Sequence, residues 1–280
     1  MKRKAYAKVN LSLDVLGRKE NGYHLLSMIM QCIDLYDTIE IKEINNGIKI
    51  NCNKINIPTD KRNLAYKAAD MFIEKYKVNK GVEIYIEKNI PTEAGLGGGS
   101  SNAATVLKVM RDMFKPQIND EELAMLGEKL GADVPFFIYG GTALCEGIGE
   151  IITPLESFRN HTLVLVKPSF GASTKDVYEE IDKITIHNHP NMDRVIKYIN
   201  ENNLKDLCKN MINVLELVTL DKYPELLEIK RDMKNLGSIG TLMSGSGSTI
   251  FGFFENHQSA KRCYNFMKDR YDEVFLSKTI

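Results

Sequence analysis

The residues with the clearest chemical meaning form a glycine-rich segment between an alternating strand and a helix, at positions 91–102 (PTEAGLGGGSSN). Glycine has no Cβ atom, so the backbone there can approach an anion closely and adopt positive φ. The N–H groups of residues 100–102, at the head of the expected helix, should lack intrahelical partners and carry the positive end of the helix dipole. This pattern predicts a loop that binds phosphate.

The loop does not match two common nucleotide motifs. A P-loop ends in Gly-Lys-Ser/Thr, and no lysine occurs between Lys88 and Lys108. A dinucleotide loop needs a third glycine where Ser100 stands, and it follows the first strand of a fold rather than lying deep in the chain. A plain connector explains four glycines in five positions poorly, because each glycine costs about 0.5–1 kcal/mol of ordering entropy. A phosphate loop of another kind is therefore favoured.

Two further places carry polar groups that an apolar fold does not require. Lys8 and Asn10 alternate along the first expected strand, so they share one face with Ser12 and Asp14. On this segment alone, a solvated strand face is the simpler explanation. Asp133 precedes the apolar run Val-Pro-Phe-Phe-Ile, where an unpaired carboxylate would be costly. It either faces a cation or polar ligand, or caps the turn before the proline.

A second loop of small residues lies at 244–248 (SGSGS), between two strand-like runs. By itself it could be a hairpin turn. Beside a phosphate loop, its glycines would let the backbone approach the same ligand. Both interpretations stay open from this segment alone.

The composition limits the class of protein. The chain has 280 residues, 43% hydrophobic and 26% charged, which suits one large or two moderate globular domains. Its 37 basic and 37 acidic side chains cancel, so we expect neither nucleic acid nor anionic lipid as a partner. No secretion signal or long apolar run is visible, and the dispersed cysteines suggest reduced thiols in the cytoplasm. These cysteines are Cys32, Cys52, Cys145, Cys208 and Cys263.

The first half reads as mixed α and β. Hydrophobic alternation predicts strands near 11–15, 27–35, 37–44, 47–52 and 81–88. Asn63 is placed to cap a helix that runs to about residue 76, and another helix follows the glycine loop to about residue 114. A third helix should start at 119 or 120 and end at Gly131. A strand, the phosphate loop and a helix are thus consecutive elements.

The second half is richer in helices. A polar stretch with Pro154 suggests a boundary near 155–162. Helical spacing is found at 174–183, 191–201, 204–217, 223–235 and 256–270. Strand patterns are found at 162–167, 238–243, 248–254 and 273–279. The predicted domains are residues 1–157 and 158–280.

Together these motifs resemble the GHMP kinase superfamily, which includes galactokinase, homoserine kinase and mevalonate kinase. The resemblance rests on 91–104 as the nucleotide loop and on 244–248 as the late motif. Within the superfamily, the chain is similar to the 4-diphosphocytidyl-2-C-methyl-D-erythritol kinases, because Gly-Tyr-His at 22–24 matches their cytidine pocket. Further matching segments are 7–11 (AKVNL), 17–24 (GRKENGYH), 131–136 (GADVPF) and 146–150 (EGIGE). Thr92 and Glu93 depart from the small or apolar residues usual at the loop entry.

The resemblance implies that the γ-phosphoryl group of ATP is transferred to an alcohol, which needs an aligned hydroxyl, an acceptor for its proton and stabilised phosphate charge. It makes Asp133 the candidate base. Lys8, expected close to Asp133, would keep that carboxylate ionised and orient the substrate hydroxyl, with Asn10 beside it. Mg²⁺ would accompany ATP, and the Ser101 hydroxyl is the candidate group near the metal.

The resemblance also divides the remaining site residues between two ligands. Those expected at ATP are Asn63, Lys88, Pro91, Gly95, Leu96, Gly97, Gly98, Gly99, Ser100, Ser101 and Asn102. Those expected at the cytidine-diphospho sugar alcohol are Asn10, Tyr23, His24, Asp133, Thr174, Tyr178, Gly245 and Ser246. Tyr23 and Tyr178 would be aromatic walls for the base, and His24 would bind its edge. An ordinary half-buried helix tyrosine also explains Tyr178, and an exposed lysine explains Lys88.

The implied fold is α+β and has two domains: an N-terminal mixed α/β domain of ribosomal-protein-S5-like topology and a helix-rich C-terminal domain, with the active site in the cleft between them. The implied reaction phosphorylates the 2-hydroxyl of 4-diphosphocytidyl-2-C-methyl-D-erythritol in the non-mevalonate route to isopentenyl diphosphate. Such an enzyme is expected to be cytoplasmic and a monomer or homodimer. The alternatives are a homoserine or mevalonate kinase, a nucleotide-binding regulator without catalysis, and an RNA-binding module of similar topology.

Overall fold

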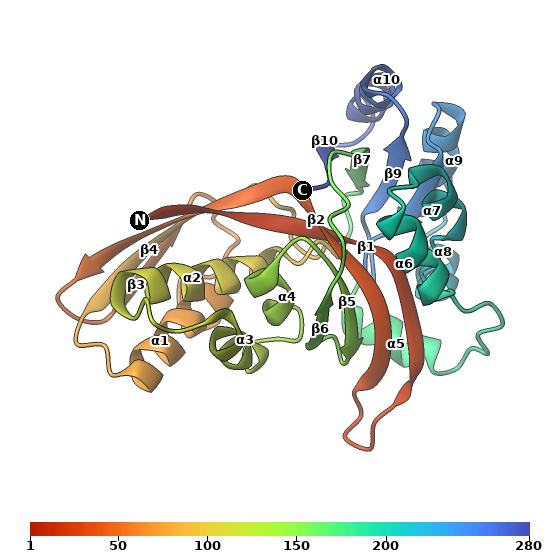
Figure 1. Cartoon of the computed structure of the whole chain (residues 1–280). Coiled ribbons are helices and arrows are strands. Elements are labelled where there is room, and N and C mark those ends of the chain that lie inside the picture. The colour runs from red at the N-terminus through yellow and green to blue at the C-terminus, as the bar shows by residue number, and fades with distance from the viewer. The chain divides into compact units, whose positions relative to one another are not determined.

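The computed structural model describes residues 1–280 (Figure 1). Its strands are β1 (Lys2–Arg18), β2 (His24–Ile44), β3 (Ile48–Cys52), β4 (Gly81–Glu87), β5 (Thr142–Gly147), β6 (Ile151–Pro154), β7 (Thr162–Lys167), β8 (Gly240–Met243), β9 (Ile250–Phe254) and β10 (Glu273–Lys278). Its helices are α1 (Leu64–Tyr76), α2 (Gly98–Phe114), α3 (Asp120–Glu128), α4 (Val134–Tyr139), α5 (Thr174–Ile181), α6 (Met192–Asn200), α7 (Leu204–Asn210), α8 (Glu216–Lys222), α9 (Glu225–Asn235) and α10 (His257–Lys268).

The chain forms two compact units, and each is discontinuous in sequence. Unit 1 consists of residues 1–7, 35–90 and 97–140. Unit 2 consists of residues 8–34, 91–96 and 141–280. The long strands β1 and β2 and the glycine loop therefore contribute residues to both units. The division at 157/158 expected from the sequence stays a prediction.

Unit 1 is a sheet covered by helices. The second half of β2 pairs antiparallel with β4, from Thr38 opposite Glu87 to Ile44 opposite Gly81, and β3 pairs parallel with β4. Alternate residues such as Ile39, Ile41 and Ile84 are fully buried. Helices α1 and α2 pack against each other on that apolar side (Figure 1). The period-two pattern in β2 and β4 thus produces the face that carries α2, the helix after the glycine loop.

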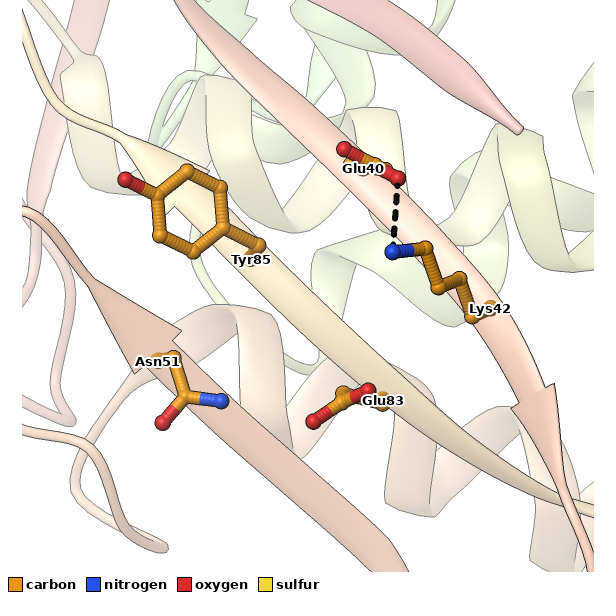
Figure 2. Close-up of a pocket in the computed structure, with 5 residues that line it drawn as sticks. All are labelled: Glu40, Lys42, Asn51, Glu83 and Tyr85. Carbon is orange, nitrogen blue, oxygen red and sulfur yellow. Dashed lines mark ion pairs between the residues drawn. The ribbon is translucent and has the colours of Figure 1, made fainter.

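The opposite face of this sheet is polar. Figure 2 shows the side chains that line a hollow there: Glu40, Lys42, Asn51, Glu83 and Tyr85. Glu40 lies opposite Tyr85 in the antiparallel register, and its carboxylate pairs with Lys42 at 3.1 Å. None of these residues belongs to the predicted site, so we interpret the hollow as part of a solvated sheet face.

Unit 2 contains two sheet regions. The first half of β2 pairs antiparallel with β5, from Leu26 opposite Gly147 to Gln31 opposite Thr142, and β5 pairs with β6. A separate antiparallel sheet has the order β10-β7-β9-β8, and all residues of β8 and β9 are buried. Helices α9 and α10 pack on this sheet. The prediction of a helix-rich α+β second half is confirmed.

Most expected elements are present, with five differences. The strand expected near 11–15 is the much longer β1, Lys2–Arg18. The runs 27–35 and 37–44, which only Tyr36 separates, form one strand, β2, in which the polar Asp37 is buried and its carboxylate is hydrogen-bonded. The helix expected over 204–217 is two helices, separated where Asn213 turns inward to bond other segments. Helix α3 ends at Glu128, three residues before Gly131. The short elements α4, β5 and β6 were not predicted, because their runs are too brief to show a period.

The five cysteines form no disulfide, and four of them are buried. Burial alone raises the pKa of the Cys208 thiol to about 12. No helix combines the length and the apolar character needed to span a membrane.

A buried ion pair stands at the junction between β4 and the glycine loop. The Lys88 ammonium donates to Asp37 Oδ2 at 2.6 Å and to the Ile90 carbonyl at 2.8 Å. Asp37 Oδ1 accepts from the backbone N–H groups of Asn89 and Ile90, both at 2.7 Å. The Asp37 side chain is 0% exposed and that of Lys88 is 7% exposed. One carboxylate therefore holds the corner where the chain leaves the sheet.

Replacing Asp37 by asparagine should lower the free energy of unfolding by about 3–5 kcal/mol, because the Lys88 ammonium would stay buried without its counter-charge. Urea unfolding measures this loss. The matched control is Glu40→Gln on the same strand, whose partner Lys42 is exposed; it should cost less than about 1 kcal/mol. Equal losses for the two variants would contradict a structural role for the buried pair.

Candidate functional site

The glycine loop leads directly into α2. Gly97 is the N-cap residue, with φ 69° in the left-handed region, and no side chain caps the helix. The Ser101 N–H donates to the Gly97 carbonyl at 2.9 Å. The free amides are therefore those of residues 98–100, two residues earlier than the 100–102 expected from the sequence, because Gly98 and Gly99 themselves belong to the first helical turn. An uncapped start of a 17-residue helix suits an anion.

Glycine is required at this start by close packing within unit 1. A Cβ atom on Gly98 would lie 2.9 Å from Lys88 Nζ, and one on Gly99 would lie 3.6 Å from Leu64 Cδ1. The structure thus brings Lys88 and the start of α1 next to the first turn of α2. Lys88 uses two of its three N–H groups on Asp37 and the Ile90 carbonyl, so the simple picture of an exposed lysine is wrong.

Asn63 caps α1 as predicted. Its Oδ1 accepts from the Ala65 N–H at 2.9 Å, and its Nδ2 donates to the Pro58 carbonyl at 2.7 Å. Just before it, hydrogen bonds from Arg62 lower the pKa of Asp60 to about 2. Asn63 therefore has a structural task, and its contact with a nucleotide stays a prediction.

Two polar side chains in the first turns of α2 point into the protein. The Ser101 hydroxyl donates to the Tyr6 carbonyl at 2.6 Å. This bond uses the hydroxyl proton and not the lone pairs of Ser101 Oγ. Asn102 is 4% exposed, and its Oδ1 has no hydrogen-bond partner. Such an orphaned buried oxygen marks a place where an external group would complete the bonding.

Asp133 stands directly before α4 and is half-buried. Its side chain makes no capping hydrogen bond to that helix, so the alternative of a turn-capping aspartate is not supported. A Cβ atom on Gly131, two residues earlier, would lie 4.0 Å from Ser100 Oγ. The turn that carries Asp133 therefore packs beside the start of α2, where the free amides lie.

Lys8 and Asn10 in unit 2 are buried, with exposed fractions of 4% and 0%. Lys8 Nζ donates to Asn10 Oδ1 at 2.6 Å, and Asn10 Nδ2 contacts Met28 Sδ at 3.4 Å. The solvated strand face, the simpler explanation from the sequence, is wrong. The alternation is real, but other parts of unit 2 cover this face.

The glycine loop and the late loop touch within unit 2. The loop 244–248 joins the antiparallel strands β8 and β9, so it is a hairpin turn as one interpretation had it. A Cβ atom on Gly95 would lie 2.0 Å from the Ser244 carbonyl oxygen, and Ser244 Oγ donates to the Gly95 carbonyl at 2.9 Å. A Cβ atom on Gly245 would lie 3.5 Å from Lys8 Nζ. Both loops therefore meet at the Lys8 ammonium.

Other residues predicted at the substrate lie near this point. Thr174 Oγ1 and Ser246 Oγ are 2.9 Å apart. Asn213 Nδ2 donates to the carbonyls of Met243 and Gly245, both at 2.8 Å, and so holds the late loop. Asn213 was missed from the sequence, because nothing near it in the chain indicates what it bonds.

The hairpin between β1 and β2 carries the residues expected at cytidine. Tyr23 is 60% exposed at its tip. The ring of His24 stacks on that of Tyr178, with centroids 4.8 Å apart and an angle of 30°. His24 Nε2 lies 2.7 Å from Asp182 Oδ1, whose other oxygen accepts from Arg18 Nη1 at 3.1 Å. The structure thus joins His24 and Tyr178, although 154 positions separate them by number (178 − 24).

Acidic residues in unit 2 were also missed from the sequence. Asp182 lies at the end of α5, where an exposed aspartate is unremarkable. Asp14 is 4% exposed, and its carboxylate lies 2.8 Å from His189 Nδ1. The only sequence signal that could have identified Asp14 is that it shares a strand face with Lys8. Lys8 belongs to unit 2 and Asp133 to unit 1, and their expected proximity stays a prediction.

Comparison with known proteins gives a consistent result. The family profile described as the GHMP kinases N terminal domain matches residues 63–141, and the GHMP kinases C terminal profile matches residues 188–273. A protein of Clostridium tetani named 4-diphosphocytidyl-2-C-methyl-D-erythritol kinase is 59% identical, with 100% of both chains covered. A protein of the same name from Clostridium botulinum (strain Kyoto) is 57% identical, again over 100% of both chains.

Solved structures share the fold. A crystal structure of 4-(cytidine 5'-diphospho)-2C-methyl-D-erythritol kinase matches with a TM-score of 0.85 and 32% identity, covering 100% of this chain and 99% of that one. Homoserine kinase from Cytophaga hutchinsonii matches with a TM-score of 0.75 and 18% identity, covering 100% and 97%, which shows the fold alone. The family resemblance inferred from the sequence motifs is confirmed. This chain belongs to the 4-diphosphocytidyl-2-C-methyl-D-erythritol kinase family of the GHMP kinases.

Proposed function

We propose that this chain transfers the γ-phosphoryl group of ATP to the 2-hydroxyl of 4-diphosphocytidyl-2-C-methyl-D-erythritol, giving ADP and the 2-phosphate. This is a step of the non-mevalonate route to isopentenyl diphosphate. The observation that carries the proposal is the stacking of His24, at the start of β2, on Tyr178 of α5. A nucleobase site needs aromatic surface with a hydrogen-bonding edge, and the full-length relatives are named for a diphosphocytidyl compound.

The ATP phosphates would bind at the start of α2. The free amides of residues 98–100 and the positive end of the helix dipole supply the attraction, with the glycines allowing close approach. The charge of Lys88 is already balanced by Asp37, so this lysine shapes the loop rather than acting as a P-loop lysine does. Its ammonium keeps one N–H group beyond its two bonds to Asp37 and Ile90.

Mg²⁺ is proposed as the metal that enters with ATP. Oxygen donors suit this cation, and the first turns of α2 offer the lone pairs of Ser101 Oγ and the unpaired buried Asn102 Oδ1. These residues fit a site completed largely by phosphate oxygens and water. Bound there, the ion would neutralise charge on the transferring phosphoryl group.

Asp133 is proposed to accept the proton of the substrate hydroxyl. Its carboxylate is not used as a helix cap, and its turn packs beside Ser100 at the phosphate end of α2. Lys8 is proposed to orient the same hydroxyl and to balance charge on the phosphoryl group, with Asn10 holding its ammonium at 2.6 Å. Gly245 and Ser246 would line the substrate beside Lys8.

Homoserine and mevalonate are less suitable substrates for this chain. Neither contains a nucleobase, so neither would use the stacked rings of His24 and Tyr178. The homoserine and mevalonate kinases of similar fold are 18% and 20% identical, which shows shared fold alone. A regulator without catalysis would not need the buried Lys8–Asn10 pair, because burying a charge is costly.

Replacing Asp133 by asparagine should lower kcat by about 10²-fold or more and leave ATP affinity largely unchanged, because a base acts in the transition state. Steady-state ADP release and ATP titration measure the two quantities. Asp120→Asn is the control, since Asp120 is an exposed residue of α3 that forms an ion pair with Arg111. A matching loss of ATP affinity in Asp133→Asn would make Asp133 structural and contradict its role as base.

ADP release should be fast with 4-diphosphocytidyl-2-C-methyl-D-erythritol and near background with homoserine or mevalonate. The three compounds are compared side by side at equal ATP and Mg²⁺. The nucleobase contacts supply the selectivity, since each stacked base contributes about 1–3 kcal/mol. Turnover of homoserine or mevalonate alone would overturn the proposed substrate.

A further inference from the structure

His24 is held from two sides by residues of unit 2. Its ring stacks on Tyr178 at 4.8 Å between centroids, and its Nε2 atom lies 2.7 Å from Asp182 Oδ1. The side chain is only 10% exposed. An imidazole fixed this firmly has one orientation, and its Nδ1 atom has no hydrogen-bond partner within the chain.

Asp182 is itself fixed. Its Oδ2 atom accepts from Arg18 Nη1 at 3.1 Å. Arg18 Nε in turn donates to the Gly22 carbonyl at 3.1 Å, in the turn just before His24. The carboxylate therefore bridges the hairpin and the end of α5 with one oxygen committed to each basic group.

The charge of Asp182 decides which nitrogen of His24 carries the proton. A carboxylate only accepts hydrogen bonds, so at 2.7 Å the Nε2 atom must be the donor. In the neutral ring the Nδ1 atom then has a free lone pair and acts as an acceptor. Asp182 thus makes the Nδ1 atom of His24 a hydrogen-bond acceptor.

We propose that Asp182 is a positioning residue that selects a cytosine over a uracil base by fixing the tautomer of His24. The two bases differ at position 4, where cytosine has an amino donor and uracil a carbonyl acceptor. The Nδ1 lone pair matches the amino group and opposes the carbonyl. This inference rests on the proposed function, in which a diphosphocytidyl compound binds at the hairpin, and adds the reason for cytidine.

The size of the effect follows from the burial of His24. Facing a uracil carbonyl would leave two buried acceptors opposed, which makes a difference of roughly 10- to 100-fold in affinity. Stacking on Tyr178 contributes equally to both bases and gives no selectivity. Selectivity should therefore change through Asp182 without a comparable change in stacking.

Asparagine at position 182 makes the sharpest test. Arg18 still needs an oxygen acceptor, so the amide oxygen should face Arg18 and the amide nitrogen should face His24 Nε2. His24 would then have to accept at Nε2 and carry its proton on Nδ1, which matches uracil. In Asp182→Ala no side chain at position 182 fixes the proton of His24, so neither tautomer is imposed.

Isothermal titration with CDP and UDP measures the selectivity of the ligand-binding protein directly. The unmodified chain should bind CDP at least about tenfold more tightly than UDP. Asp182→Asn should bring the ratio to one or below, with UDP binding gained, while Asp182→Ala should reduce the ratio without that gain. Glu180→Gln is the matched control, because it removes the same charge from α5 at an exposed pair with Lys183 and should leave the ratio unchanged.

An unchanged ratio of CDP to UDP affinity in Asp182→Asn would overturn the inference, and this includes equal weakening of both ligands, which a merely structural bridge would cause. Ring nitrogen NMR shifts of His24 give a second readout without ligand, with the proton on Nε2 in the unmodified chain and on Nδ1 in Asp182→Asn. The proposed function is tested separately by turnover. Turnover of 4-diphosphocytidyl-2-C-methyl-D-erythritol together with equal CDP and UDP affinities would contradict this inference alone. Selective CDP binding without that turnover would contradict the proposed function alone.

Discussion

The contact between Gly95 and the Ser244 carbonyl is the constraint on which the site in unit 2 depends. A side chain at position 95 would need a Cβ atom 2.0 Å from that oxygen, so only glycine allows the two loops to meet. The contact joins residues 149 positions apart and is completed by the Ser244 hydroxyl on the Gly95 carbonyl. Because Gly245 in turn lies against Lys8 Nζ, the backbone approach also decides where the ammonium stands. Packing of bare backbone thus sets the position of a charge.

Buried charges in this protein are paired locally. Lys88 forms an ion pair with Asp37, the Asp14 carboxylate contacts the ring of His189, and the Lys8 ammonium donates to the Asn10 amide oxygen. Each pairing limits the desolvation cost that an isolated charge would impose. The arrangement is also consistent with the proposed phosphate loop, which has no lysine of its own. In the proposed function, the helix amides attract the anion, Lys88 shapes the loop, and Lys8 faces the substrate.

The elements were largely predictable from the sequence, whereas their partnerships were not. Alternation in β2 and β4 and the cap at Asn63 are local signals, and local interactions determine them. The period of β1 placed Lys8 and Asn10 on one face, but it carried no information on what would cover that face. Asp182 and Asn213 make their important bonds to residues far away in the chain, and single aspartates and asparagines are too common on surfaces to draw attention. The aromatic pair was predictable only through the family resemblance.

The discontinuous units affect how the chain assembles during synthesis. Residues 8–34 are synthesised before residues 141–280, with which they form unit 2. Unit 1 can therefore collapse while most of unit 2 is still being made, since chains fold as units in the order of synthesis. Until then the strand segment with Lys8 and Asn10 has no cover for its polar face. Lys8 and Asn10, proposed to act on the substrate hydroxyl, are thus translated well before the residues that give them their native surroundings.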